Sequence, residues 1–149
     1  MTFAVCLLLC LFIKHFVADF PLQMTPWMYK NKGSFVWWKG VPIYPHPGGI
    51  VHSGIHAIGT SCVVAGCLAA YGYPEALILP VAQSAALTDF VVHYIIDFSK
   101  VNIGKHFGLL PTNSEWFWVL LGLDQLLHAL TYFYIVHSMP IVEMLCRRF

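Results

Sequence analysis

The chain has 149 residues, of which 58% are hydrophobic and only 10% are charged, and its mean hydropathy is +0.70. Soluble domains carry about 25% charged residues, so this composition excludes a water-soluble protein. The formal net charge of +1 also excludes nucleic acid as the expected partner, because binding it takes a surplus of Lys and Arg. The length suits a single domain that covers residues 1–149.

Four apolar stretches are long enough to cross a bilayer as a helix, which takes about 20 residues. They cover residues 2–22, 50–71, 75–98 and 115–138. The sequence therefore predicts an all-α membrane protein, built as a bundle of four transmembrane helices in the lipid bilayer. The first stretch lacks a basic segment before it and carries Lys14, His15 and Asp19, so it is expected to stay in the mature protein rather than act as a cleaved signal peptide.

The first two stretches are joined by residues 23–49, a long connection that is rich in proline and tryptophan and contains three lysines. Tryptophan is enriched where a membrane meets water, so we expect this loop to lie at the interface. The connection at residues 99–114 lies on the same side of the predicted bundle and adds two lysines. The positive-inside rule makes this lysine-rich side cytoplasmic.

Every aspartate of the sequence lies inside a predicted span, four residues from a histidine. An aspartate at the centre of a membrane helix costs about 2.5 to 3.5 kcal/mol, and residues four apart share one helix face. The spans together supply nine candidate metal ligands: His15, Asp19, His52, His56, Asp89, His93, Asp97, Asp124 and His128. Most lie toward the same ends of their spans, so a shared site is expected in the cytoplasmic half of the membrane.

Nine ligands exceed the four that one tetrahedral zinc ion accepts, so the sequence predicts two metal ions, or one ion with supporting groups. Mixed imidazole and carboxylate ligands suit zinc, manganese or iron better than calcium or magnesium, and zinc is the first choice. A purely structural network of histidines and aspartates is the alternative, but it leaves buried carboxylates without full compensation. Haem is disfavoured because the pairs lie along single helix faces beside carboxylates.

Five polar residues near the predicted ligands are candidates for supporting roles. Gln23 and Gln125 are expected to orient ligands from outside the metal shell, with a helix end and a helix-packing hydrogen bond as the alternatives. Lys100, Lys105 and His106 are expected to bind an anionic group of a substrate. Their alternative is an ordinary anchoring role at the membrane surface.

Two further features are expected to take no part in the chemistry. Lys14 precedes His15 directly, so it is expected to point away from the ligand face of its helix. The cysteines form no CxxC motif, and four of the five lie inside apolar runs. They are expected to be buried small hydrophobic side chains rather than a disulfide framework or a zinc knuckle.

The order of the motifs resembles a family of small bacterial and phage inner-membrane proteins that are usually described as predicted membrane-bound metal-dependent hydrolases. The resemblance spans nearly the whole chain and rests on KHFVADFPLQ at residues 14–23, His52-x3-His56, His93-x3-Asp97-x2-Lys100 and Asp124-Gln125-x2-His128. It implies a multi-pass protein of the bacterial inner membrane. It also implies metal binding by His15, Asp19, His52, His56, His93, Asp97, Asp124 and His128, whereas Asp89 is added from its spacing alone.

The expected function is that of a membrane-embedded hydrolase of an ester, amide or phosphoester, in which bound metal ions activate water. Asp89 and Asp124 are the candidate general bases. The expected substrate is a lipid, a lipid-linked compound or a phosphorylated small molecule. Two alternatives stay open: a divalent-metal or proton translocation protein, which a homo-oligomer can complete, and a structural or regulatory membrane protein that uses a metal ion as a staple.

Overall fold

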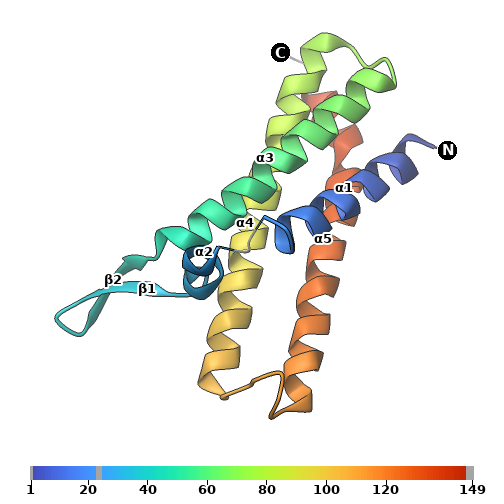
Figure 1. Ribbon diagram of the computed structural model, residues 1–149. Helices are drawn as coiled ribbons and strands as arrows, with labels where there is room; N and C mark the ends of the chain where they lie inside the picture. Colours follow the sequence, from blue (N-terminus) through green and yellow to red (C-terminus); the bar gives the residue numbers. More distant parts are fainter. Residues whose placement is uncertain (1, 23–24, 147–149) are drawn as a thin grey trace.

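The computed structural model describes residues 2–22 and 25–146, without the side chains of residues 29 and 140–146. Its elements are α1 (Phe3–Asp19), α2 (Pro26–Asn31), β1 (Phe35–Trp38), β2 (Val41–Pro45), α3 (Pro47–Ala70), α4 (Glu75–His106) and α5 (Glu115–Cys146). The long helices alternate in direction (Figure 1). The start of α1, the α3–α4 turn and the end of α5 therefore share one end of the bundle, and the α4–α5 connection lies at the other.

Three of the described helices are long and apolar enough to cross a membrane, namely α3, α4 and residues Glu115–Met139 of α5. The first predicted span, at residues 2–22, corresponds to the helix α1. This helix has 17 residues, whereas a span takes about 20. It ends at Asp19 because Pro21 cannot continue the backbone hydrogen bonds of a helix. Helices long and apolar enough to cross a membrane thus stand at three of the four predicted spans, and a shorter helix stands at the first.

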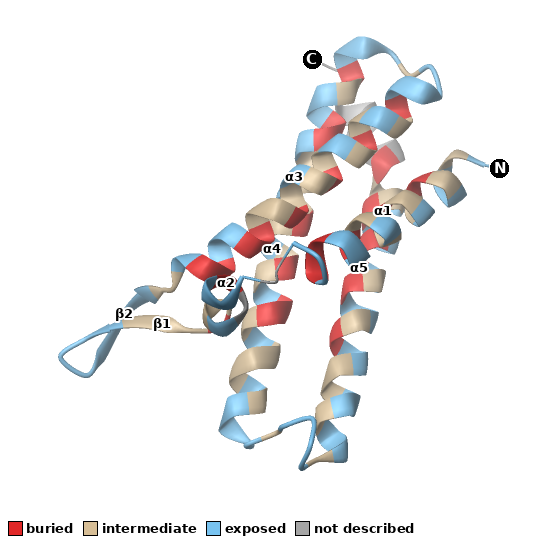
Figure 2. Cartoon of the chain, in the orientation of Figure 1, coloured by how far each residue is buried: buried red, intermediate tan, exposed pale blue. Residues whose placement is uncertain are grey.

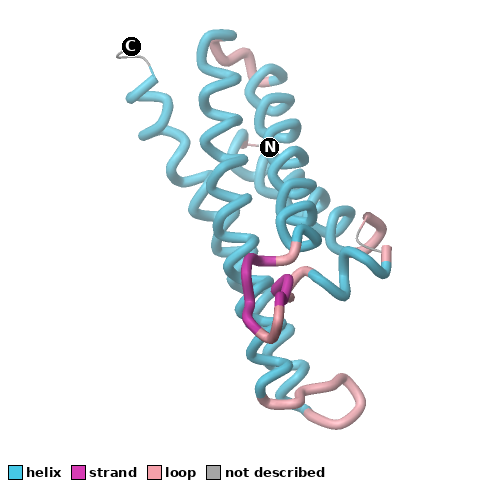
Figure 3. The backbone as a smooth tube through the Cα atoms, turned by 90° about the vertical axis from the view of Figure 1, so that its left-hand side faces the viewer, coloured by secondary structure: helices cyan, strands magenta, loops and turns pink. Residues whose placement is uncertain are grey.

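The connection at residues 23–49 is more ordered than the expected interfacial loop, because it contains α2 and the β1–β2 hairpin. The prediction of an all-α fold is therefore corrected to a mostly helical one. The strands pair antiparallel through a tight turn at Lys39 and Gly40, both of which have positive φ angles, as a two-residue hairpin turn requires. Figure 3 shows the hairpin beside the start of α3. Trp37 and Trp38 are 61% and 62% exposed there, which suits a membrane interface.

The helices α4 and α5 both extend beyond their predicted ends at residues 98 and 138. Residues 99–106 contain no proline, so α4 continues to His106, and the chain turns at Gly108, whose φ of 62° favours glycine. Pro140 was expected to follow the last helix, but α5 continues through it to Cys146, as apolar helices in membranes tolerate. At 32 residues each, these helices are about 48 Å long and exceed the hydrocarbon core of about 30 Å.

Buried residues line the facing sides of the long helices, as Figure 2 shows. Toward the end where α1 starts they are apolar and form one cluster: Leu7, Leu11, Val64, Leu68, Val81, Ala82, Ala85, Tyr132, Ile135 and Met139. Toward the other end the buried residues change to histidine and aspartate. The apolar cluster therefore closes the polar region from one side.

Candidate metal centre

All nine predicted ligands are buried, and none is more than 6% exposed. Eight of them meet where α1 ends against α3, α4 and α5, in three overlapping groups whose ligand atoms lie within 4.8 Å of one another. The groups are Asp19 with His52, His56 and His93; His15 with His93 and His128; and Asp97 with Asp124 and His128. The four-residue spacing thus brings side chains of four helices into one cluster, which we call the His/Asp centre.

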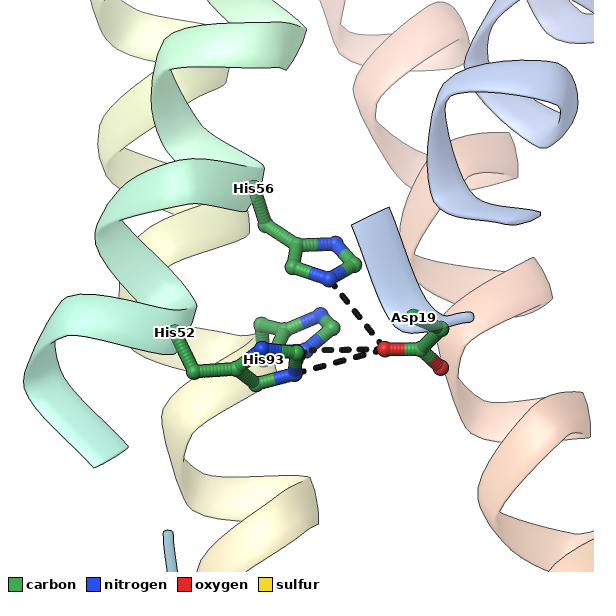
Figure 4. Close-up of side chains that lie close together, drawn as sticks. All are labelled: Asp19, His52, His56 and His93. Carbon is green, nitrogen blue, oxygen red and sulfur yellow. Dashed lines mark hydrogen bonds and ion pairs between the residues drawn. The ribbon is translucent and has the colours of Figure 1, made fainter. Parts of the chain in front are cut away.

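Asp19, the last residue of α1, lies at the middle of the first group (Figure 4). Its Oδ1 atom faces three imidazole Nε2 atoms, at 3.3 Å for His52, 3.2 Å for His56 and 4.0 Å for His93. The Nε2 atoms of His52 and His93 are themselves 3.2 Å apart. A neutral imidazole carries one N–H, so either one of these nitrogens donates to the other, or both carry lone pairs that point into the space between them. The arrangement suits nitrogens that direct lone pairs at a shared cation.

Three separations within this group match those between ligands of a single metal ion. Ligand atoms about 2.0 to 2.1 Å from a tetrahedral zinc ion lie about 3.3 Å apart. The contacts of Asp19 with His52 and with His56 measure 3.3 and 3.2 Å, and that between His52 and His93 measures 3.2 Å. Three contacts of the first group therefore fit a tetrahedral ion, whereas the 4.0 Å between His93 and Asp19 is longer and would have to shorten by less than about 1 Å.

Asp97 on α4 connects this group with the ligands of α5. Its Oδ2 atom lies 3.1 Å from Nε2 of His52, and its Oδ1 atom lies 3.7 Å from Nε2 of His128. His128 is also 3.7 Å from Oδ1 of Asp124, its neighbour one turn earlier on α5. A carboxylate with one oxygen toward each group can bridge two ions, so the His/Asp centre has the ligands for a two-metal site.

Several atoms that face the inside of the centre make no hydrogen bond within the described part of the chain. They are Nε2 of His56 and His128 and Oδ1 of Asp97 and Asp124. Buried polar atoms are otherwise almost always hydrogen-bonded, and a buried charge needs a partner or a metal ion. These atoms therefore fit a metal centre better than a purely structural network.

A tyrosine that the sequence analysis did not select holds His15 from outside the groups. The Nδ1 atom of His15 lies 2.9 Å from the hydroxyl of Tyr132 on α5, and its Nε2 atom lies 3.2 Å from Oδ2 of Asp19. Ligand imidazoles are commonly oriented by such a contact on the second ring nitrogen. Tyr132 follows His128 by four residues, and this shared helix face is the signal by which it could have been found.

Two lysines from the lysine-rich end of the bundle reach carboxylates of the centre. The Nζ atom of Lys32 lies 2.9 Å from Oδ2 of Asp97, and that of Lys100 lies 2.8 Å from Oδ2 of Asp124. Lys32 lies outside the membrane-spanning helices. Burial lowers its pKa, but the carboxylates of Asp97 and Asp19 outweigh burial and raise the pKa above its ordinary value. Lys32 is therefore a cation held against Asp97, and Lys100 contacts Asp124 in the same way on the α5 side.

The position of Lys32 depends on a close approach of the connection to α3. A Cβ atom at Gly49 would lie 2.6 Å from the backbone oxygen of Lys32, so only glycine permits this contact. No spacing links Lys32 to the predicted ligands in the sequence. It was expected only as a charge at the membrane surface.

Asp89 lies outside the three groups formed by the described residues. Its Oδ2 atom contacts Nζ of Lys14 at 2.8 Å and accepts a hydrogen bond from Thr60 at 2.5 Å. The prediction that Lys14 points away is therefore wrong. Its flexible side chain crosses α3 at Gly59, where a Cβ atom would lie 2.9 Å from it. Because Lys14 compensates the charge of Asp89, this placement speaks against the metal-ligand and general-base roles expected for Asp89.

The remaining predicted site residues differ in how close they come to the centre. Gln125 donates a hydrogen bond of 3.1 Å to Oδ2 of Asp124, an arrangement that suits the orienting role expected of it. Gln23 lies outside the described residues. Lys105 donates to a serine hydroxyl of the 23–49 connection, and His106 packs its exposed ring against the next phenylalanine. Of the three residues expected to bind substrate, Lys100 thus has an ion pair with a ligand of the centre.

The chain belongs to the family described as "Protein of unknown function (DUF3307)", whose profile it matches over residues 7–146. This range includes all eight residues that meet in the His/Asp centre. No curated protein and no solved structure matches the chain. The comparison thus shows a family of unknown function, and the metal-dependent hydrolase activity that the resemblance implied stays a prediction.

Proposed function

We propose that this protein is a membrane-embedded, metal-dependent hydrolase whose centre opens toward the cytoplasm of a bacterial cell. It uses one or two divalent transition-metal ions, with zinc first and manganese or iron as alternatives. The observation that carries the proposal is the convergence of three imidazole nitrogens on Asp19, beside Asp97 with an oxygen toward each group. These residues would hold a metal ion, which would supply Lewis-acid activation of water and of the scissile bond.

Asp124 is the candidate general base of the proposed reaction. Its Oδ2 atom is held by Lys100 at 2.8 Å and by Gln125 at 3.1 Å. Its buried Oδ1 atom makes no hydrogen bond within the described residues. A carboxylate fixed through one oxygen can accept a proton from water through the other. Asp89 suits this role less well, because an adjacent lysine neutralises it.

Two cavities between the neighbouring ends of α4 and α5 support a lipid or lipid-linked phosphate as the substrate. One, of about 410 Å³, has Lys100, Lys105 and Phe117 in its lining. The other, of about 590 Å³, is lined by apolar side chains that include Phe107 and Trp116. Both volumes are in the range of ligand sites. Lysine side chains beside an apolar cavity suit a molecule with an anionic head and a hydrocarbon tail. Lys100 lines the first cavity and also forms an ion pair with Asp124.

A divalent-metal or proton translocation protein is the alternative for the same buried groups. Conduction takes a polar path to both ends of the bundle. The apolar cluster that includes Leu7, Leu68 and Val81 lies between the His/Asp centre and the end where α1 starts, and Tyr132 is its one hydroxyl-bearing member among the described residues. This layer favours hydrolysis over translocation.

The test measures metal content, turnover and metal flux on the same preparations of full-length protein, in detergent and in proteoliposomes. We expect about one to two metal equivalents per chain and turnover of at least one member of a panel of phosphate monoesters and lipid phosphates. His93→Ala should lose metal and turnover together, because His93 belongs to two of the groups. His106→Ala changes an exposed histidine of the same helix and serves as the matched control for metal content.

Each other result selects a different account. Metal flux without turnover would favour translocation. A bound metal with neither turnover nor flux, whose loss unfolds the chain, would favour the structural staple. A folded wild-type protein that takes up no transition metal would end the proposal.

A further inference from the structure

Three cysteines form a second cluster of metal-binding side chains. Cys6 and Cys10 on α1 and Cys67 on α3 lie with their Sγ atoms within 4.8 Å of one another. The described cysteines are half-buried or, for Cys62, exposed, so the expectation that they are buried hydrophobic side chains is corrected. None of them forms a disulfide. The three thiols therefore face one another in reduced form, at a partly open place in the bundle.

Local packing holds these three residues together. Cys6 and Cys10 are four residues apart and share one face of α1. The ring of Phe3, at the start of α1, packs against the rings of Tyr71 and Tyr73 at 5.3 and 5.2 Å between centroids. This contact fixes the start of α1 beside the end of α3, where Cys67 packs against the apolar cluster. The packing of Phe3 and Cys67 thus holds the two helices that carry the thiols in place.

The thiol cluster is separate from the His/Asp centre. Cys6 and Cys10 precede His15 by nine and five residues of α1, which is about 13 and about 8 Å along a helix. Cys67 follows His56 by eleven residues of α3, which is about 16 Å. Cys67 also lies within one turn of the end of α3 at Ala70. The cluster therefore lies to one side of the centre, toward the end of the bundle at which the α3–α4 turn emerges.

The chemistry of the cluster selects a soft cation. In a trigonal arrangement with metal–sulfur bonds of about 2.3 Å, the sulfur atoms lie about 4 Å apart, so movements below 1 Å close the observed cluster around one ion. Thiolates select Cu(I) or zinc, but structural zinc sites take four ligands. The group formed by the described residues offers three, all of them sulfur. Three sulfur ligands without a fourth favour Cu(I).

We propose that Cys6, Cys10 and Cys67 form a site for a single Cu(I) ion, independent of the His/Asp centre. Each thiol that binds the ion as a thiolate releases its proton to solvent. No electron is transferred, because copper is already monovalent when it binds. The ion crosslinks α1 to α3 at the end of the bundle away from the proposed hydrolytic site.

The test titrates Cu(I) into full-length protein in detergent under anaerobic, reducing conditions, against a chromogenic Cu(I) chelator. We expect one tightly bound equivalent for the wild type. Cys6→Ser, Cys10→Ser and Cys67→Ser should each weaken binding at least about tenfold, since even the loss of an outer partner of a metal ligand commonly costs this much. Cys62→Ser, an exposed cysteine on the same helix as Cys67, should bind like the wild type, and so should His93→Ala.

A second measurement on the wild-type protein needs no variant to fold. Bound Cu(I) should protect Cys6, Cys10 and Cys67 from alkylation, as read by mass spectrometry, and leave Cys62 reactive. Absence of stoichiometric binding, binding that Cys62→Ser weakens as much as Cys10→Ser, or equal protection of all four thiols would overturn the proposal. Loss of Cu(I) binding in His93→Ala would overturn its independence from the His/Asp centre.

Discussion

Asp97 on α4 and His128 on α5 face each other across the His/Asp centre, with Nε2 of the histidine 3.7 Å from Oδ1 of the aspartate. The second oxygen of Asp97 lies 3.1 Å from Nε2 of His52 on α3. Asp97 therefore contacts both halves of the ligand set. Its removal is expected to affect every metal ion that the centre holds.

The substitution Asp97→Asn keeps the size of the side chain and removes its charge. We expect the metal content at a fixed free metal concentration to fall at least about tenfold, because the change removes a ligand, and outer partners alone commonly contribute 10- to 100-fold. Elemental analysis of the purified variant measures this, with His106→Ala as the control. Full metal content in a folded Asp97→Asn variant would show that the carboxylate does not bind the ions.

The ion pair of Lys14 and Asp89 is expected to stabilise the fold without holding metal. Asp89→Asn leaves the buried Lys14 ammonium without its carboxylate, and breaking such a pair costs about 3 to 5 kcal/mol. Denaturant unfolding in detergent should show this loss, while the folded fraction keeps its metal. The double variant Lys14→Met with Asp89→Leu should recover part of the stability. Unchanged stability together with lost metal would instead make Asp89 a ligand.

Tyr132→Phe removes the hydroxyl that lies 2.9 Å from Nδ1 of His15 and leaves the ring in the apolar cluster. We expect metal affinity to fall about 10- to 100-fold, as for other changes that release the second nitrogen of a ligand imidazole. Competition with a metal chelator measures the affinity. Tyr134→Phe makes the same change at an exposed position of the same helix and should leave the affinity unchanged. Equal affinities for the two variants would contradict the orienting role of Tyr132.

Lys100→Gln tests whether the lysine beside Asp124 binds the anionic part of a substrate. We expect KM for a phosphoester to rise at least about tenfold, because a hydrogen bond to a charged group contributes about 1.5 to 3 kcal/mol, whereas KM for a neutral ester should change little. Lys39→Gln, at an exposed lysine of the β1–β2 turn, is the matched control. An equal rise in KM for neutral and charged substrates would argue that Lys100 acts only through Asp124.

The His/Asp cluster could be predicted from sequence because helical spacing and position along a predicted span are both local properties. Two residues four apart share one face of a helix, and their position along a predicted span gives their depth in the membrane. His52, His56 and Asp97 could therefore be assigned to one shared site before their contacts were known. Eight of the nine predicted ligands do meet. Asp89 satisfies the same spacing but meets a lysine instead, and spacing alone cannot distinguish the two partners.

The lysine contacts and the hairpin could not be predicted, because they depend on tertiary structure. Lys14 was expected to point away from the ligand face because its Cβ does not lie on that face. Its four-carbon side chain nevertheless crosses α3 at Gly59, where the absence of a Cβ leaves room. Lys32 reaches Asp97 only because α2 packs beside α3. The hairpin at Lys39 and Gly40 could not be recognised in the sequence because Pro42 and Pro45 follow it, and proline is unusual in strands. Proline is allowed here because both strands are edge strands.

The most direct measurement of the central claim is anomalous diffraction at the metal absorption edge, from crystals grown with zinc supplied. The account predicts a peak between Asp19, His52, His56 and His93, with a second beside Asp97, Asp124 and His128 when both sites are filled. A folded protein that binds zinc elsewhere, or shows no peak within bonding distance of these side chains, would contradict it.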